Sequence, residues 1–150
     1  MQITAGKLIL GLVAVFVLMQ AIRPAKTNPA GNPAMSLRAA RPDGAAALAV
    51  MDRSCRDCHS NDTTWPWYSR VAPVSWLVAR DVRGGRRHLN MSEFGMYPAE
   101  KQQKRLKDAC EQVRTGEMPM WIYTLQHPDA TLRPGDVELI CGLSAGSPRP

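Results

Sequence analysis

Two cysteines and a histidine lie within five positions of one another, in Cys55-Arg56-Asp57-Cys58-His59. This is the C-x-x-C-H pattern to which haem c is attached. On a helical turn, thiols at this spacing can each form a thioether with one vinyl group of the same porphyrin, and the adjacent imidazole then faces the iron. The motif therefore predicts one covalently bound haem c, held by Cys55 and Cys58, with His59 as its proximal ligand.

The same residues fit three other kinds of site less well. A thioredoxin-like redox motif would open a helix after a strand within a βαβ unit, which the surrounding sequence does not indicate. A zinc site would need two more ligands at short spacing, whereas Cys110 and Cys141 stand alone. A plain disulfide between Cys55 and Cys58 is the third alternative.

An electron carrier needs a second axial ligand, and a methionine is the first candidate. Met118 lies in Gly116-Glu117-Met118-Pro119, just past a predicted helix stop, and the following proline stiffens its loop. A thioether ligand raises the reduction potential relative to two imidazoles. His127, beside Pro128, is the alternative sixth ligand and would give bis-histidine ligation. Met120, like most of the other methionines, is expected to pack in the core.

Four helices are predicted to position these ligands. They span residues 45–56, 73–87, 98–115 and 134–143, with Asp43 placed to cap the first of them. Proline and glycine stand at several of their starts and stops. No run alternates apolar and polar residues as a half-buried strand would. The expected fold class is all-α, a cytochrome c-like helical domain around a covalent haem, with long loops at 60–72 and 117–133.

The N-terminal part of the chain is predicted to lie outside that domain. Residues 1–23 include an uncharged apolar run and are predicted to form a transmembrane anchor or a signal segment. The Pro/Ala-rich residues 24–44 are predicted to be a linker, 45–146 the haem-binding domain and 147–150 a tail. More basic residues follow the apolar run than precede it, which alone would favour a cytoplasmic domain. Because haem c is attached after export, we expect the periplasmic face instead.

Composition narrows the functional classes. A chain of 150 residues that is 45% hydrophobic and 21% charged suits one soluble domain, neither disordered nor multi-spanning. The formal charge of +6 is spread along the chain without a nucleic-acid-binding motif, so nucleic acid is not an expected partner. Aromatic residues make up only 6% of the chain. The core is therefore thin, and a porphyrin would supply the missing bulk.

Several longer blocks of the sequence match a known family. They are QAIRP at 20–24, TNP at 27–29, CRDCHSNDTTWPWYSRVAPVSWLVARDV at 55–82, GR at 85–86, LNMSEF at 89–94 and GEMPMWIYTLQHPDATL at 116–132. The chain resembles the bacterial haem-binding domain family of small, membrane-anchored, class-I-cytochrome-c-like proteins. The Trp-Pro-Trp-Tyr and Ala-Pro-Val-Ser-Trp sequences make the resemblance specific, because they are not general features of cytochromes. It implies haem c binding and a redox role.

With this resemblance, further pocket residues can be assigned. Large side chains near the motif are expected to form the pocket wall or to reach the haem propionates: Trp67, Tyr68, Trp76 and Arg86. The carbonyl of Ala72 or Pro73 is expected to orient the His59 ring through its other nitrogen.

The remaining cysteines, Cys110 and Cys141, are expected to form a disulfide in an oxidising compartment. The bond would close a loop of 31 residues around Met118. In the chain-entropy model such a loop stabilises the fold by roughly 3–4 kcal/mol. Two buried free thiols are the alternative.

These expectations combine into one functional hypothesis. The protein is expected to be anchored in the inner membrane of a bacterium, to face the periplasm and to transfer single electrons to an unidentified redox partner. The alternatives are a haem-based redox or gas sensor, and an accessory haem subunit of a peroxidase or oxidase system. A catalytic peroxidase is less favoured, because no acid-base pair for an open haem face is evident.

Overall fold

The computed structural model describes residues 4–145, and within that range every regular element is a helix. This confirms the all-α class. The α-helices are α1 (Ala5–Met19), α2 (Leu37–Ala40), α3 (Ala45–Ser54), α4 (Arg56–His59), α5 (Val74–His88), α6 (Ala99–Arg114), α7 (Trp121–Gln126) and α8 (Asp136–Ala145). Short 3-10 turns lie between them: η1 (Pro33–Met35), η2 (Trp67–Arg70), η3 (Phe94–Met96) and η4 (Pro128–Ala130).

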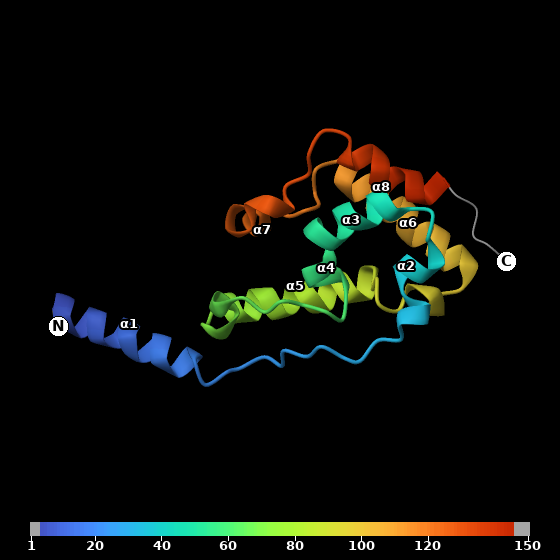
Figure 1. Ribbon diagram of the computed structural model, residues 1–150. Coiled ribbons are helices and arrows are strands. Elements are labelled where there is room, and N and C mark those ends of the chain that lie inside the picture. The colour runs from blue at the N-terminus through green and yellow to red at the C-terminus, as the bar shows by residue number, and fades with distance from the viewer. Residues whose placement is uncertain (1–3, 146–150) are drawn as a thin grey trace.

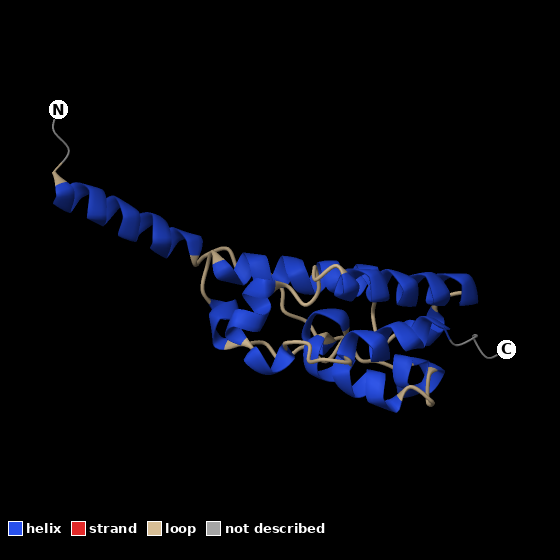
Figure 2. Cartoon of the chain, turned by 90° about the horizontal axis from the view of Figure 1, so that it is seen from above, coloured by secondary structure: helices blue, strands red, loops and turns tan. Residues whose placement is uncertain are grey.

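The helices form two groups on either side of α4. On one side α8 packs against α3 and α6, and on the other side α4 packs against α5 (Figure 1). Figure 2 shows the same elements from above, with α1 projecting away from the rest. Helix α6 ends where Gly116 takes φ +75°, a conformation that glycine adopts without steric cost. The chain then turns back toward α4.

The hydrophobic core lies mainly within the α3, α6 and α8 group. Leu48 and Met51 of α3, Leu106 of α6 and Ile140 of α8 are almost completely buried, together with Phe94. Each such side chain stabilises the fold by roughly 1.5–3 kcal/mol relative to an exposed one. This core therefore fixes one wall against which α4 is placed.

The first predicted helix is broken at the functional motif. Cys55 has φ −126° and ψ −25°, outside the helical range, so α3 ends at Ser54 and α4 begins at Arg56. Asp43 does not cap α3, because the cap position is Gly44 and no side chain bonds there. The predicted loop 117–133 contains α7 and η4.

The predicted linker 24–44 is in fact packed against the domain. It contains η1 and α2, and Leu37 is only 1% exposed. Lys26 donates to the Ser69 carbonyl oxygen at 3.1 Å and the Asn28 amide donates to the Thr63 carbonyl oxygen at 2.9 Å. Prolines restrict the backbone of this segment, and several of its side chains contact the domain surface.

Helix α1 lies apart from the domain and contains no buried residue (Figure 1). It is 15 residues long. Across residues 4–145, no helix combines the length and apolar character needed to cross a membrane, so the transmembrane helix expected from the sequence is not supported. The predicted tail 147–150 falls outside the described residues.

Candidate functional site

The C-x-x-C-H motif forms a single helical turn. The amides of Cys58 and His59 donate to the Cys55 carbonyl oxygen at 3.3 and 2.9 Å. The loop after the turn is held to Asp57, whose carbonyl accepts from the Thr63 hydroxyl at 2.7 Å and whose carboxylate accepts from the Thr64 amide at 3.0 Å. These bonds present both thiols and the imidazole from one short, fixed segment.

The ring of His59 is oriented by a backbone carbonyl. Its Nδ1 donates to the Leu89 carbonyl oxygen at 3.0 Å, just beyond the end of α5. The expectation that Ala72 or Pro73 plays this part is wrong, because Leu89 takes the ring N–H. The Ala72 carbonyl accepts from the Gln20 amide, and the Pro73 carbonyl accepts from the Trp76 amide. Burial lowers the pKa of His59, although the Leu89 bond opposes the shift. A neutral ring with Nδ1–H so engaged keeps its Nε2 lone pair free for a metal ion.

Helices α4 and α5 approach closely at Gly85. A Cβ atom at Gly85 would lie 2.4 Å from the Cys58 carbonyl oxygen and 2.9 Å from its carbonyl carbon. No side chain larger than hydrogen fits against backbone atoms at those distances. Gly85 is therefore required for the motif to lie directly on α5.

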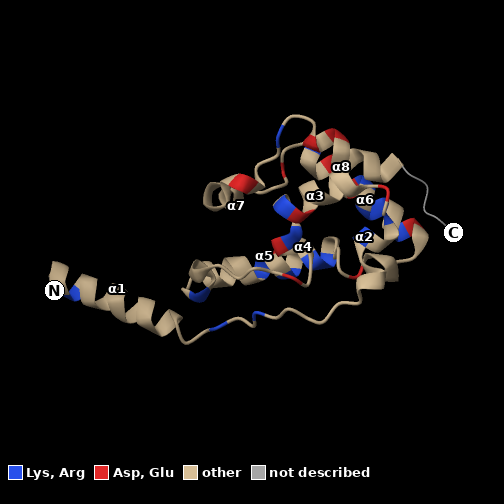
Figure 3. Ribbon diagram, viewed as in Figure 1, with Lys and Arg blue, Asp and Glu red and all other residues tan. Residues whose placement is uncertain are grey.

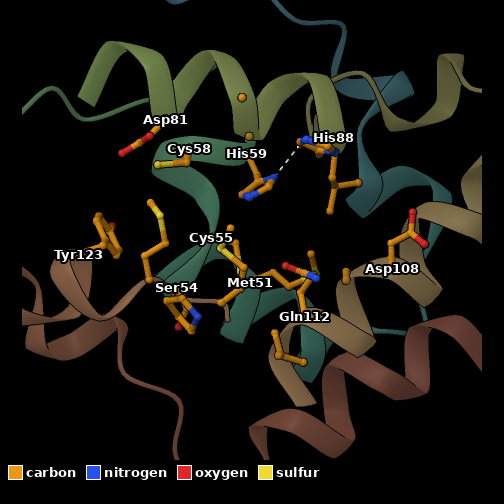
Figure 4. A pocket seen from close by; sticks show the side chains of 18 of the residues that line it. Met51, Ser54, Cys55, Cys58, His59, Asp81, His88, Asp108, Gln112 and Tyr123 are labelled. Atoms are coloured by element: carbon orange, nitrogen blue, oxygen red, sulfur yellow. Dashed lines mark hydrogen bonds between the residues drawn. The ribbon is translucent and has the colours of Figure 1, made fainter. Parts of the chain in front are cut away.

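A cavity of about 650 Å³ opens beside the motif. Its lining is mainly apolar and comes from α3, α4, α5, α6, α8 and the segment around α7. Figure 4 shows Cys58, His59 and Tyr123 at this hollow, with Met51 and Gln112 on the opposite side. Cofactor pockets commonly measure roughly 300–1,000 Å³. The cavity therefore has the size and character of a cofactor site.

The two thiols of the motif are free and face this cavity. Burial raises the pKa of the Cys55 thiol to about 12, and the neighbouring Cys58 adds to this shift. Burial also raises the pKa of the Cys58 thiol to about 11, and the charge of Asp57 adds to that shift. A thioredoxin-like thiol would have a lowered pKa instead. Among residues 4–145, no group of three or more His, Cys, Asp and Glu side chains is placed to hold a metal ion. The redox-thiol, zinc and Cys55–Cys58 disulfide alternatives therefore gain no support.

Met118 lines the same cavity as His59. The Met118 amide donates to the Gln112 carbonyl oxygen at 3.1 Å, which ties the loop to α6. Cys110 and Cys141 form a disulfide between α6 and α8, the pairing expected from the sequence. Met118 therefore lies on a segment that is bonded to α6 and that belongs to the loop closed by the disulfide. Met120 also lines the cavity.

His127, the alternative sixth ligand, does not line the cavity. Its Nε2 lies 2.7 Å from the Tyr68 hydroxyl, and its ring stacks on Tyr123 with centroids 4.5 Å apart. The neighbouring Tyr123 hydroxyl donates to the Asp57 carboxylate at 2.9 Å, and burial raises the Tyr123 pKa. This group of side chains joins α7 to η2 and to the motif itself.

The four residues expected as pocket wall or propionate partners lie elsewhere. None of Trp67, Tyr68, Trp76 and Arg86 lines the cavity. Trp67 is 77% exposed, and the Trp76 indole donates to the Ile22 carbonyl oxygen at 2.8 Å. They follow the motif in sequence, but they lie outside the cavity lining, two of them on η2 and two on α5.

Arg86 organises the outer side of the motif. Its guanidinium donates to the Ser60 carbonyl at 2.7 Å, the Thr27 carbonyl at 2.8 Å and the Thr63 hydroxyl at 2.9 Å. Burial lowers its pKa, and Glu93 opposes that shift. Arg86 therefore binds the N-terminal segment to the loop after the motif.

Sequence reasoning did not single out three residues that shape the site. Gly85 and Tyr123 lie within the blocks that resemble the family, which was their only signal. Leu89 also begins one of these blocks, but it acts through its carbonyl, which every residue type possesses, so its side chain gave no sign of this role.

The donor set fits a haem, because two free thiols and an oriented imidazole share one mainly apolar cavity with a thioether. Comparison with known protein families also points to haem binding. The model of the haem-binding domain family matches residues 14–143. No curated protein and no solved structure matches the chain significantly.

Proposed function

The chain belongs to the haem-binding domain family, and from that premise we propose that it is a c-type haem protein that transfers single electrons. In this proposal Cys55 and Cys58 form the thioether links, His59 is the proximal ligand and Met118 is the sixth ligand. Haem, when bound, supplies an iron centre that cycles between two oxidation states. The protein supplies attachment, ligation and burial.

One observation carries the proposal. The free thiols of Cys55 and Cys58, the imidazole of His59 and the thioether of Met118 all line a single cavity. Each group is of the type that haem c requires, and each comes from a segment held by backbone hydrogen bonds.

The surroundings of Met118 favour electron transfer over gas sensing. A sensor needs its sixth ligand to leave readily, so that a small molecule can bind. Met118 is joined to α6 by its own amide, and α6 is joined to α8 by the Cys110–Cys141 bond. Restricting the loop in this way keeps the thioether at the cavity, where it would hold the iron of a bound haem as a carrier needs.

The disulfide and α1 support a location at the outer side of the inner membrane. Structural disulfides form in exported proteins and are rare in the cytosol. Helix α1 has no buried residue within the chain, and its apolar side chains favour a lipid environment. We infer that the N-terminal segment directs export and associates with the membrane, and that the domain faces the periplasm.

Absorption spectra of the protein, produced with a haem c maturation system, test this function. The ferric wild type should show the far-red band of thioether ligation, and the reduced form should bind carbon monoxide slowly. Met118→Ala should lose the band and bind carbon monoxide rapidly. Met120→Ala and Met96→Ala are matched controls, the first inside the cavity and the second an exposed residue outside it.

Two results would contradict the proposal. Rapid carbon monoxide binding by the wild type would favour the sensor function instead. Absence of covalent haem from the purified protein would remove the c-type assignment altogether.

A further inference from the structure

Exposed apolar side chains gather at one end of the domain. Apart from α1, the exposed large apolar residues of this end lie on η2 with the residue after it, the first turns of α5, and α7: Trp67, Val71, Val74, Leu77, Trp121, Ile122 and Leu125. Trp67 and Trp121 are 77% and 75% exposed. We call this group the apolar end. Such a group of exposed apolar residues commonly marks an interaction surface.

Hydrogen bonds join the elements of the apolar end to one another. The Tyr68 hydroxyl of η2 contacts His127, the residue that follows α7. The Ser75 amide of α5 donates to the carbonyl oxygen of Val71, the residue after η2, at 2.8 Å. Between η2 and α5, the Ala72 amide donates to the side-chain oxygen of Gln20 at 2.9 Å. The apolar end is therefore a single structured surface, and not a set of separate loops.

The same bonds attach the apolar end to the end of α1. Gln20 follows α1 directly, and its side-chain amide also donates to the Ala72 carbonyl oxygen at 3.2 Å. The Trp76 indole of α5 donates to the carbonyl of Ile22. In both views α1 leaves the domain from this end (Figures 1 and 2). Whatever apolar medium surrounds α1 therefore begins beside the apolar end.

Basic side chains flank the junction between α1 and the domain. Arg23 and Arg70 are exposed, and Lys26 lies against η2 through its bond to the Ser69 carbonyl. Figure 3 shows basic residues on the segment after α1 and at this end of the domain. Tryptophan and cationic side chains together are typical of the boundary between lipid tails and anionic headgroups.

We propose that the apolar end rests on the surface of an anionic lipid bilayer, beside α1. Trp67 and Trp121 enter the headgroup region, and the flanking basic residues contact the lipid phosphates. This inference rests on the membrane association of α1 in the proposed function. It adds a second, separate contact that fixes how the domain lies on the membrane.

Amide hydrogen exchange of the full-length haem protein tests the contact. The protein is reconstituted into vesicles of phosphatidylcholine and phosphatidylglycerol, and exchange is compared with that in detergent. Residues 66–71 and 121–127 should exchange more slowly on vesicles. The double variant Trp67→Ser/Trp121→Ser should lose this protection, and its vesicle partition coefficient should fall about tenfold or more. Vesicles of phosphatidylcholine alone should give weaker protection.

Control variants separate the contact from general effects. Met96→Ser changes another exposed apolar residue, 66% exposed on η3, and should behave as wild type. Leu125→Glu should reproduce the effect of the double variant by a different chemistry. Unchanged haem spectra in all variants show that each has folded.

Three outcomes would overturn the inference, and they are distinguishable. If vesicles bind the protein but these residues exchange as in detergent, the apolar end does not contact the bilayer, and the protein is bound to the membrane through α1 alone. If vesicles do not bind it, the membrane association of α1 fails as well, while the haem spectra still judge electron transfer. If protection needs no vesicles and rises with protein concentration, a second copy of the chain covers the apolar end.

Discussion

Replacing Gly85 with alanine tests the close approach that positions the motif. The new Cβ would lie 2.4 Å from the Cys58 carbonyl oxygen, 1.0 Å less than the 3.4 Å at which ordinary contact begins. The obstructing atoms belong to the backbone of α4, so no side chain can rotate away. Helices α4 and α5 must separate, and the separation displaces Cys58 and His59 relative to the α5 wall of the cavity.

The cost follows from two opposing effects. Overpacking a close contact costs roughly 1–3 kcal/mol, and a backbone obstruction lies toward the upper end of that range. Alanine in a helix interior gains roughly 0.5–1 kcal/mol over glycine. The free energy of unfolding should therefore fall by about 2 kcal/mol, and Tm by roughly 8 °C.

Gly84→Ala is the matched control, because it changes the preceding residue of the same helix. Its Cβ would meet only the Arg87 guanidinium, at 3.9 Å. This variant should gain roughly 0.5–1 kcal/mol, so the two variants should differ by about 3 kcal/mol. Thermal unfolding by circular dichroism measures the difference, and the yield of covalent haem should fall only in Gly85→Ala. Equal stability of the two variants would refute the close approach of α4 and α5.

Three further variants test other contacts. Removing the disulfide with Cys110→Ser and Cys141→Ser should lower the free energy of unfolding by roughly 3–4 kcal/mol, measured by denaturant titration, and an unchanged midpoint would refute its stabilising role. Arg86→Gln should cost about 2 kcal/mol and expose residues 23–36 to proteolysis, whereas an uncut segment would argue against this contact. The Arg133 amide and the Arg53 side chain lower the pKa of the Asp136 carboxyl in the folded protein. The ionised carboxylate therefore stabilises the fold at pH values above the pKa of the unfolded state. This stabilisation is lost as the pH falls through the pKa of the folded state. The Tm advantage of wild type over Asp136→Asn should therefore shrink below about pH 4, and a constant difference would contradict it.

The motif could be predicted from the sequence because its chemistry is local. Cys55, Cys58 and His59 lie on one turn, so their spacing alone places them together. The positions of α5 and α6 were also predicted to within two residues, since proline precedes both helices and Gly116 follows α6. Cys55 itself interrupts the predicted helix, because the motif needs a change of direction that helical periodicity does not encode.

The cavity wall could not be predicted, because room for a large ligand comes from small residues as much as from large ones. Gly84 and Gly85 line the cavity where aromatic residues were expected. Trp67 and Trp76 are near the motif in sequence, but neither lines the cavity. The segment 24–44 has the composition of a linker, yet single residues such as Leu37 and Asn28 dock it.

For the proposed electron transfer, the docked segment between α1 and the domain has a consequence. If residues 24–44 were a freely flexible chain, its root-mean-square end-to-end distance would be roughly 25 Å, and the domain could move over that distance relative to α1. Docked through Lys26, Asn28 and Leu37, the segment instead follows one fixed path along the domain between α1 and α3. In a membrane-held protein, the cavity then keeps one height and one orientation. Under the proposed function, a redox partner would have to match that geometry. Lateral diffusion in the plane of the membrane, rather than the length of a flexible linker, would then set how often the two proteins meet.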